Sequence, residues 1–238
     1  MCGIVGYVGS RKAQPLLLAG LEKLEYRGYD SAGVSVLRGE RIETVRAVGN
    51  LSQLRDAIAA RPEQAQDRGR VEHAVVGRAD SGAVALAEPS QVREGAGAWT
   101  PVGTGIGHTR WATHGRVTEA NAHPHSDTRN RIHVVVNGIV ENYAALKEEL
   151  IGEGAVFTSD TDSEVIAHLI ARHYEGDLVE AVRLAYGELR GHYALVAMSA
   201  DEPGLLVGAR KECPLIVGRG DGEQFIGSAI PAFLKETR

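Results

Sequence analysis

Cysteine, a signal sequence and long apolar runs are what this sequence most clearly lacks. Its 238 residues include 2 cysteines, too few for a disulfide framework, and this scarcity fits a reducing compartment. No run of about 18 apolar residues could span a membrane, and no basic and then apolar signal peptide opens the chain. These absences predict a soluble, cytoplasmic protein without a membrane partner.

Positive charge is not in excess either. The chain carries 26 Lys and Arg against 31 Asp and Glu, a formal net charge of −5, which argues against a general nucleic-acid binder. Hydrophobic residues make up 43% of the chain, which is ample for a core. The 29 glycines gather at turns and between short strands, and the length allows one large domain or two small ones.

Cys2 directly follows Met1, and a small side chain at this position allows an aminopeptidase to remove the methionine. The mature chain would then begin with Cys2, which would carry a thiol and a free α-amine on one Cα. Reference pKa values are about 8.5 for a thiol and about 7.7–8.0 for an α-amine. Near neutrality such an amine can act as the base for its own nucleophile. The alternative is a small, inert core cysteine, because free cysteines are usually buried.

Apolar periodicity and breaker residues predict where the helices and strands lie. Helices are expected at 13–24, 51–61, 141–152, from 161 onward and at 177–188, with a short helix closing the chain. Strands are expected at 4–8, 33–38, 41–48, 104–115, 132–136, 192–199, 205–209, 214–218 and 224–228. Because strands and helices do not alternate regularly, we expect an α+β fold of antiparallel sheets with helices packed outside them.

Residues 62–103 differ from the rest of the chain. They contain 3 prolines and a loose glycine-rich run, and only the apolar patch at 74–76 would suit a short strand. No core-sized pattern appears, so we expect a surface insertion in a single domain that spans residues 1–238.

Two local patterns have a plain structural interpretation. Thr161 and Glu164 have the spacing of a capping box, which would place Asp162 in the first turn of a helix. Asn137-Gly138 follows the apolar strand 132–136, and this dipeptide commonly forms the turn that ends a strand.

Six segments taken together resemble the class II glutamine amidotransferases. They are residues 2–6, 24–33, 107–115, 121–125, 137–138 and 159–164. Within that class, residues 25–33 and 108–115 look like the glucosamine-6-phosphate synthases, and the resemblance covers nearly the whole chain apart from 62–103. It implies an N-terminal-nucleophile hydrolase fold, a four-layer αββα sandwich of two antiparallel sheets between helix layers.

The resemblance also implies a site for L-glutamine in which Cys2 attacks the side-chain amide. Asn137 and Gly138 would form the oxyanion hole. The Arg110 guanidinium would pair with the substrate α-carboxylate, and Asp162 would hold the α-ammonium. The remaining residues would line or support the pocket: Trp111, Thr113 and His114 as substrate-binding residues, and Arg27 and His123 as supporting ones.

Some of these residues have simpler alternatives. Asp162 could be a helix-start residue only, since a carboxylate is favourable there, and Trp111 could be a core or interface aromatic. Several histidines invite a metal site, but no zinc spacing with paired cysteines appears. We therefore expect neither a metal nor a cofactor.

The resemblance further implies that the chain is the glutaminase half of a larger, homodimeric enzyme. A sugar-isomerising domain or subunit, which nothing in this sequence matches, would use the ammonia to convert D-fructose 6-phosphate into D-glucosamine 6-phosphate. Two alternatives remain open: the glutaminase domain of another class II amidotransferase, and an inactive glutaminase-like module kept for binding.

Three departures from the family pattern stand out. Val136 occupies the place where a histidine usually precedes Asn-Gly, which would change the wall behind the oxyanion hole. Residues 211–213 stand where small residues usually precede a proline, and the insertion at 62–103 is longer than the usual connection.

Overall fold

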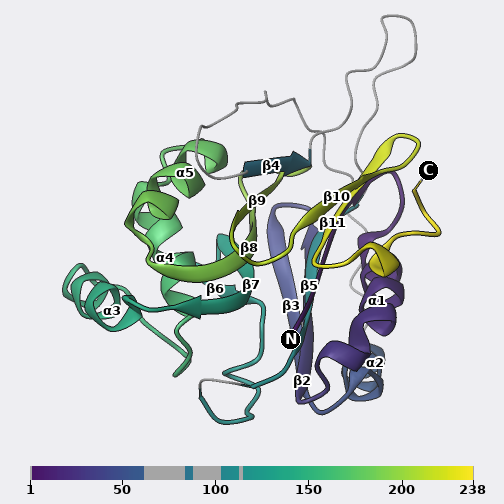
Figure 1. The fold of residues 1–238 in the computed structure, drawn as a ribbon, viewed down its shortest axis with the longest axis horizontal. Coiled ribbons are helices and arrows are strands. Elements are labelled where there is room, and N and C mark those ends of the chain that lie inside the picture. The colour runs from purple at the N-terminus through teal and green to yellow at the C-terminus, as the bar shows by residue number, and fades with distance from the viewer. Residues whose placement is uncertain (1, 62–83, 88–102, 113–114, 238) are drawn as a thin grey trace, which may run out of the picture.

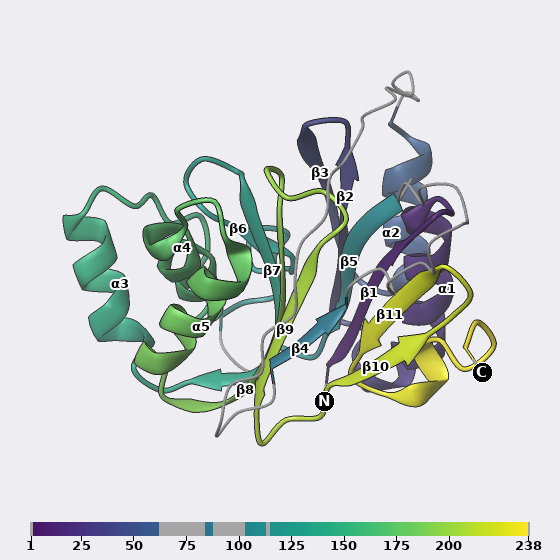
Figure 2. The same ribbon diagram turned by 90° about the horizontal axis from the view of Figure 1, so that it is seen from above.

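A computed structural model of the chain describes residues 2–61, 84–87, 103–112 and 115–237. Two antiparallel sheets lie face to face, and helices cover the outer face of each (Figure 1). Figure 2 shows the four layers side by side. The α+β sandwich expected from the sequence is therefore confirmed.

The six-stranded sheet has the order β10-β11-β1-β5-β2-β3. In that order its strands are Ile216–Arg219, Glu223–Gly227, Gly3–Gly9, Gly103–Arg110, Ser31–Arg38 and Arg41–Val48. β1 thus lies in the middle of the sheet and pairs with β11 on one side and β5 on the other. The strands predicted at 33–38 and 41–48 are confirmed as β2 and β3, which form a hairpin with Gly39 at a φ of 58° in its turn.

The five-stranded sheet has the order β4-β9-β8-β7-β6. In that order its strands are Val84–Ala87, Leu206–Lys211, Gly191–Ser199, Ile132–Val140 and His125–Ser126. The edge strand β4 comes from the segment 62–103, so the chain returns to the sheet within the predicted insertion. The predicted strand at 74–76 lies outside the described residues.

Two predicted strands have wrong ends: the strand expected at 104–115 ends at Arg110 as β5, and the strand expected at 132–136 is longer. β7 does not stop at Asn137-Gly138 but runs on to Val140, and its ladder with β8 continues as far as the pair Val140 and Gly191. The neighbouring strand supplies hydrogen-bond partners along the whole length, which overrides the local turn preference of an Asn-Gly pair.

The predicted helices are confirmed to within a few residues. α1 (Ala13–Leu24) and α2 (Leu51–Ala59) pack on the six-stranded sheet, while α3 (Tyr143–Gly152), α4 (Glu164–His173) and α5 (Leu178–Glu188) form the layer on the five-stranded sheet. Two short 3-10 turns follow α1 and β11, at Glu25–Arg27 (η1) and Ile230–Ala232 (η2). No helix in the described part of the chain is long and apolar enough to cross a membrane.

The predicted capping box is wrong. α4 begins at Glu164, after Ser163, and Asp162 precedes the helix. The Glu164 carboxylate accepts the backbone N–H groups of Thr158 and Ser159 at 2.8 and 2.7 Å. The Thr161 hydroxyl lies 3.0 Å from Nε2 of the His125 ring instead of capping the helix.

Side chains along β1 alternate between two hydrophobic layers. Ile4 and Val8 face the second sheet and pack in a cluster with residues such as Val135 and Val196. Tyr7, on the other face, packs toward α1 and α2. This alternation fixes which face of each strand lies between the sheets.

Glycines in β5 let α1 lie close to that strand. A Cβ on Gly105 would stand 2.9 Å from Leu17 Cδ1, and one on Gly107 would stand 3.1 Å from Leu21 Cδ1. α1 therefore packs directly on the backbone of β5, the strand that ends at Arg110.

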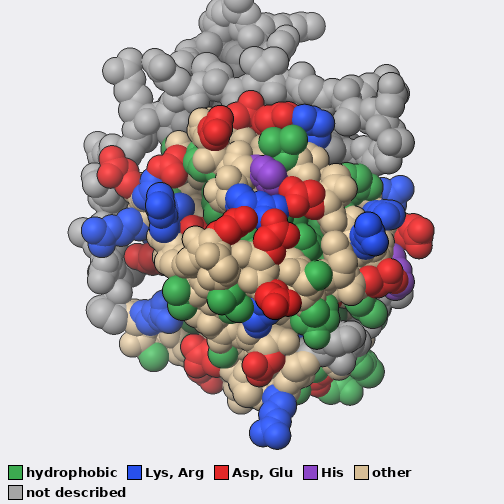
Figure 3. Space-filling view, turned by 90° about the vertical axis from the view of Figure 1, so that its left-hand side faces the viewer, with side chains coloured by type: hydrophobic (Ala, Val, Ile, Leu, Met, Phe, Trp, Pro, Cys, Tyr) green, Lys and Arg blue, Asp and Glu red, His purple; other side chains and the backbone are tan. Residues whose placement is uncertain are grey.

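The outer face of the α3–α5 layer is charged, with acidic and basic side chains interspersed (Figure 3). Arg172 on α4 lies 2.6 Å from Glu149 and 3.3 Å from Glu153, and it also pairs with Glu188. Glu149 and Glu153 are exposed, and ion pairs with exposed partners contribute little to stability. This face is a solvated surface.

Candidate active site

The pairing of β1 with β5 brings Cys2 beside the end of β5. Gly3 lies opposite Thr109, so Cys2 meets the segment that follows. The Trp111 backbone N–H donates to Cys2 Sγ at 3.1 Å, and the thiol lies 3.5 Å from the Trp111 carbonyl. These two contacts hold the half-buried thiol at the strand end.

Burial raises the pKa of the Cys2 thiol above its ordinary value. The Trp111 N–H and the Arg110 guanidinium favour the thiolate and oppose this shift, whereas the Asp30 carboxylate adds to it. Because the net direction is upward, the thiol is protonated near neutrality. It needs a base before it can act as a nucleophile.

Asn137 lies beside Cys2, although the two residues are 135 positions apart in the sequence. Asn137 Nδ2 donates to the Cys2 carbonyl at 3.1 Å, and Asn137 Oδ1 lies 3.0 Å from His108 Nε2. Gly138 has a φ of 103°, and a Cβ there would stand 2.0 Å from the His192 carbonyl oxygen. Only glycine fits this position.

Arg110 and Asp162, of opposite charge, are both buried, with 4% and 5% of their surfaces exposed. Burial lowers the pKa of Arg110, while the charges of Cys2, Asp30 and Asp162 raise it. The Asp162 carboxylate accepts the Val140 N–H at 2.7 Å. Its interpretation as a helix-start residue is therefore wrong, because it is anchored to the end of β7 and precedes α4.

A contact that sequence reasoning missed holds the 110–112 segment over the thiol. The Asp30 N–H donates to the Arg110 carbonyl at 3.1 Å, and Asp30 Oδ2 accepts the Ala112 N–H at 2.8 Å. A Cβ on Gly28 would stand 2.6 Å from the Arg110 carbonyl carbon. Asp30 and Gly28 both belong to the motif at 25–33, so this motif is the sequence feature that could have indicated the contact.

Arg27 supports β1 from the other side. Its guanidinium donates to the Ser228 carbonyl at 3.2 Å, and the Ser228 hydroxyl accepts the Ile4 N–H at 3.0 Å. Trp111 is 45% exposed and meets Tyr29 edge to face at 5.4 Å between ring centroids. It is therefore not a core aromatic. Thr113 and His114, expected in the same pocket, lie outside the described residues.

Three buried histidines extend inward from Asn137. The His108 and His123 rings stack at 4.2 Å, and His123 meets His125 at 4.4 Å. Burial lowers the pKa of His108 to about 4, that of His125 to about 3 and that of His123 well below its usual value. All three are neutral near pH 7. Over the described ranges, no group of three or more His, Cys, Asp or Glu residues could hold a metal ion.

The sequence led us to expect Val136 in the wall behind Asn137, but the structure places its side chain elsewhere. Its side chain is buried in the cluster between the five-stranded sheet and the helices, with Val165 and Leu169. Successive residues of a strand point to opposite faces, so the side chains of positions 136 and 137 cannot share a wall. His108 lies behind the Asn137 amide instead.

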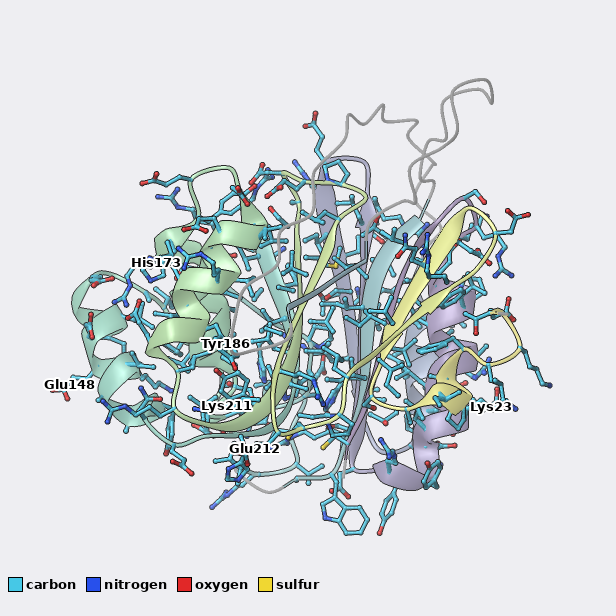
Figure 4. The ribbon with its side chains drawn as sticks, turned by 45° about the horizontal axis from the view of Figure 1, so that its top comes forward. Lys23, Glu148, His173, Tyr186, Lys211 and Glu212 are labelled. Atoms are coloured by element: carbon cyan, nitrogen blue, oxygen red, sulfur yellow. The ribbon has the colours of Figure 1, made fainter. Side chains whose placement is uncertain are left out.

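The departure at 211–213 lies at the end of β9. Glu212 has a φ of 69°, a left-handed conformation that is uncommon outside glycine. Figure 4 shows Tyr186 of α5 near Lys211 and Glu212, and the Tyr186 hydroxyl donates to the Arg210 carbonyl at 3.3 Å.

The chain is similar to curated proteins over its whole length. Curated relatives named glutamine–fructose-6-phosphate aminotransferase [isomerizing] include those of Symbiobacterium thermophilum, 47% identical over 238 residues, and Streptomyces coelicolor, 45% identical over 240 residues. Each alignment covers 100% of this chain and 33% of the relative. The chain thus spans about a third of the length of these relatives.

Two solved structures share the fold. One is glutamine phosphoribosylpyrophosphate amidotransferase from B. subtilis with ADP and GMP, at a TM-score of 0.67 and 22% identity. The other is described as the allosteric regulatory enzyme of purine biosynthesis, at a TM-score of 0.68 and 23% identity. Each match covers 98% of this chain and 43% of the other.

A family profile provides the assignment. The profile, described as "Glutamine amidotransferase domain", matches residues 108–235, more than half of the chain. The match includes the end of β5, the Asn137-Gly138 pair and Asp162. The chain therefore belongs to the glutamine amidotransferase domain family.

Proposed function

We propose that this chain hydrolyses L-glutamine to L-glutamate and ammonia, with Cys2 as the nucleophile. The observation that carries the proposal is the position of the thiol. Cys2 Sγ accepts the Trp111 N–H at 3.1 Å, and Asn137 Nδ2 donates to the Cys2 carbonyl at 3.1 Å. A nucleophile and a candidate oxyanion donor thus meet at one strand end, as acyl transfer requires.

The base would be the α-amine of Cys2 after removal of Met1. This amine, directly or through a water molecule, takes the thiol proton, and the thiolate adds to the side-chain amide carbon of glutamine. The C–N bond then breaks, and the proton passes to the leaving ammonia. Water adds to the resulting γ-glutamyl thioester, which releases glutamate and restores the thiol.

The remaining roles follow from charge and position. Asn137 Nδ2 and the Gly138 N–H would donate to the oxyanion, and each such donor is typically worth about 2.7–4 kcal/mol in the transition state. Arg110 would bind the α-carboxylate of glutamine and Asp162 its α-ammonium. Trp111, Thr113 and His114 would line the pocket, and Arg27 and His123 would support it. The reaction itself requires no cofactor.

The ammonia would go to a sugar substrate. The curated relatives are named for a fructose-6-phosphate aminotransferase, and this chain aligns with about a third of their length. We infer that residues 1–238 form one glutaminase domain of a cytoplasmic, homodimeric enzyme. Its sugar-isomerising domain or subunit would turn D-fructose 6-phosphate into D-glucosamine 6-phosphate.

The deciding experiment combines intact mass with glutamine hydrolysis. The purified chain should lack Met1 and release glutamate and ammonia, whereas Cys2→Ala should bind glutamine without hydrolysing it. Cys213→Ala, which alters the second half-buried thiol, is the matched control and should keep wild-type turnover. Full activity with Met1 retained would contradict the α-amine mechanism, and an inert wild-type chain would favour the binding-module alternative.

A further inference from the structure

The Asn137 amide has two ends with opposite properties. Its NH₂ end can donate to an oxyanion, whereas its oxygen can only accept and would repel one. A donor stabilises the transition state only if it is oriented before the reaction begins. The residue that fixes which end of this amide faces Cys2 therefore matters for the rate.

The contacts of Asn137 settle its orientation. Its Nδ2 lies 3.1 Å from the Cys2 carbonyl oxygen, which is an acceptor only, so the NH₂ end must face Cys2. Its Oδ1 then faces His108 Nε2 at 3.0 Å. Because Oδ1 also only accepts, His108 must carry a proton on Nε2.

The surroundings of His108 make it a rigid, neutral donor. The side chain lies between the two sheets with 1% of its surface exposed, and burial lowers its pKa to about 4. The ring stacks on His123 at 4.2 Å between centroids. His123 Nδ1 in turn accepts the backbone N–H of Val136, the residue before Asn137, at 3.2 Å.

We propose that His108 is a positioning residue for glutamine hydrolysis, which donates its Nε2–H to Asn137 Oδ1 and so directs the Asn137 NH₂ toward the reacting carbonyl. His123 holds the His108 ring and the start of the Asn137 segment together. This inference rests on the proposed function, and it assigns His108 to the oxyanion hole through Asn137 and not through contact with substrate.

The test compares two substitutions of similar size. His108→Met removes the donor, and His108→Gln keeps an N–H that can reach Asn137 Oδ1. We expect kcat for glutamine to fall about ten- to a hundredfold in His108→Met, part of the loss typical of a missing oxyanion donor. KM should stay within about twofold, because a donor to the oxyanion acts mainly in the transition state. His108→Gln should recover most of kcat.

A double-mutant cycle separates positioning from general damage to the core. In an Asn137→Ala background, His108→Met should change kcat by less than about twofold, because no amide remains to be oriented. His133→Met is the matched control. His133 is also 1% exposed, but its ring meets Ser35 and Thr44, so kcat should stay near wild type.

Three results would overturn the proposal while the wild-type chain hydrolyses glutamine. The first is an unchanged kcat in His108→Met. The second is a fall in kcat on His108→Met that is as large in the Asn137→Ala background as in wild type. The third is a His108→Gln variant that keeps its Tm but loses as much activity as His108→Met. If His108→Met does not fold, the comparison of His108→Gln with wild type decides. A wild-type chain that does not hydrolyse glutamine would overturn the proposed function and this one together.

Discussion

The Asp162 carboxylate has two tasks that a single substitution can separate. It accepts the Val140 N–H at 2.7 Å, which anchors the end of β7, and we propose that its charge binds the substrate ammonium. An asparagine at this position keeps an oxygen for the Val140 N–H but loses the charge.

We therefore predict that Asp162→Asn keeps a Tm near wild type and raises KM for glutamine. Loss of a hydrogen bond to a charged group costs about 1.5–3 kcal/mol, which corresponds to about a ten- to hundredfold fall in kcat/KM. Asp162→Ala should lower both Tm and kcat/KM. Unchanged glutamine kinetics in Asp162→Asn would leave the residue with the structural task alone.

Gly28 is required for space and not for backbone conformation. Its φ of −176° is open to any residue, but a Cβ would stand 2.6 Å from the Arg110 carbonyl carbon. Gly28→Ala should push the 110–111 segment away from Cys2 and lower kcat at least tenfold, with a smaller effect on Tm. Steady-state kinetics and thermal unfolding measure the two effects.

The control is Gly152→Ala at the end of α3, where a Cβ would meet nothing within 4 Å. Its kcat should equal wild type, since alanine also has the higher helix propensity. If Gly28→Ala behaved like this control, the tight contact between residue 28 and the end of β5 would have no part in activity.

The start of α4 depends on one buried carboxylate. Each oxygen of Glu164 accepts a different backbone N–H, from Thr158 at 2.8 Å and from Ser159 at 2.7 Å. An amide in its place would turn an NH₂ group toward one of these donors. The loop that carries Asp162 would then lose its anchor.

Glu164→Gln should accordingly destabilise the chain by about 1.5–3 kcal/mol, the range for hydrogen bonds to charged groups. Urea unfolding measures this loss. Glu148→Gln, on the exposed face of α3 (Figure 4), should be neutral. An equal, negligible effect of both changes would contradict the anchoring of α4 by Glu164.

A helix or strand can be predicted from the sequence when the residues that determine it are close together in the chain. Apolar periodicity gave the helices and most strands, because each pattern is local. It failed at Asn137-Gly138, where pairing with β8 overrides a turn preference, and at Thr161, whose hydroxyl is taken up by His125. Because β7 continues through Asn137, successive side chains alternate between its two faces, and Val136 points away from the Asn137 side chain.

The candidate site could be predicted only in part. Cys2 and the polar residues near Arg110 were identified from their motifs. The link from His108 to Asn137 was not, because it depends on how β5 of one sheet faces β7 of the other, and a single sequence does not show that packing. Asp30 was inside a motif, but its contact with Ala112 spans 82 positions.

Burial of several neutral histidines between the sheets makes the whole molecule sensitive to acid. Burial lowers the pKa of His108 and His133 to about 4 and that of His125 to about 3. The unfolded chain therefore binds more protons than the folded chain below about pH 6.5. Stability is fully present above that pH and is lost as pH falls toward 4.

The free energy of unfolding should decrease by about 1.4 kcal/mol per pH unit for each such histidine in the steep part of this range. Urea unfolding at a series of pH values from 7 to 4.5 measures the slope. His133→Gln removes one of these groups and should make the slope shallower. A stability that does not change over this range would mean that these histidines are protonated in the folded chain.

The central place of β1 also has a consequence for biosynthesis. Its residues pair with β11, as in Val5 with Gly227, so β1 is synthesised early but can complete its pairing only after β11 has been made. During synthesis, one edge of β1 is therefore unpaired, which leaves the amino end accessible to an aminopeptidase.

A purification tag fused ahead of Cys2 would prevent removal of Met1 by the aminopeptidase. Recombinant chains should therefore carry their tag at the carboxyl end.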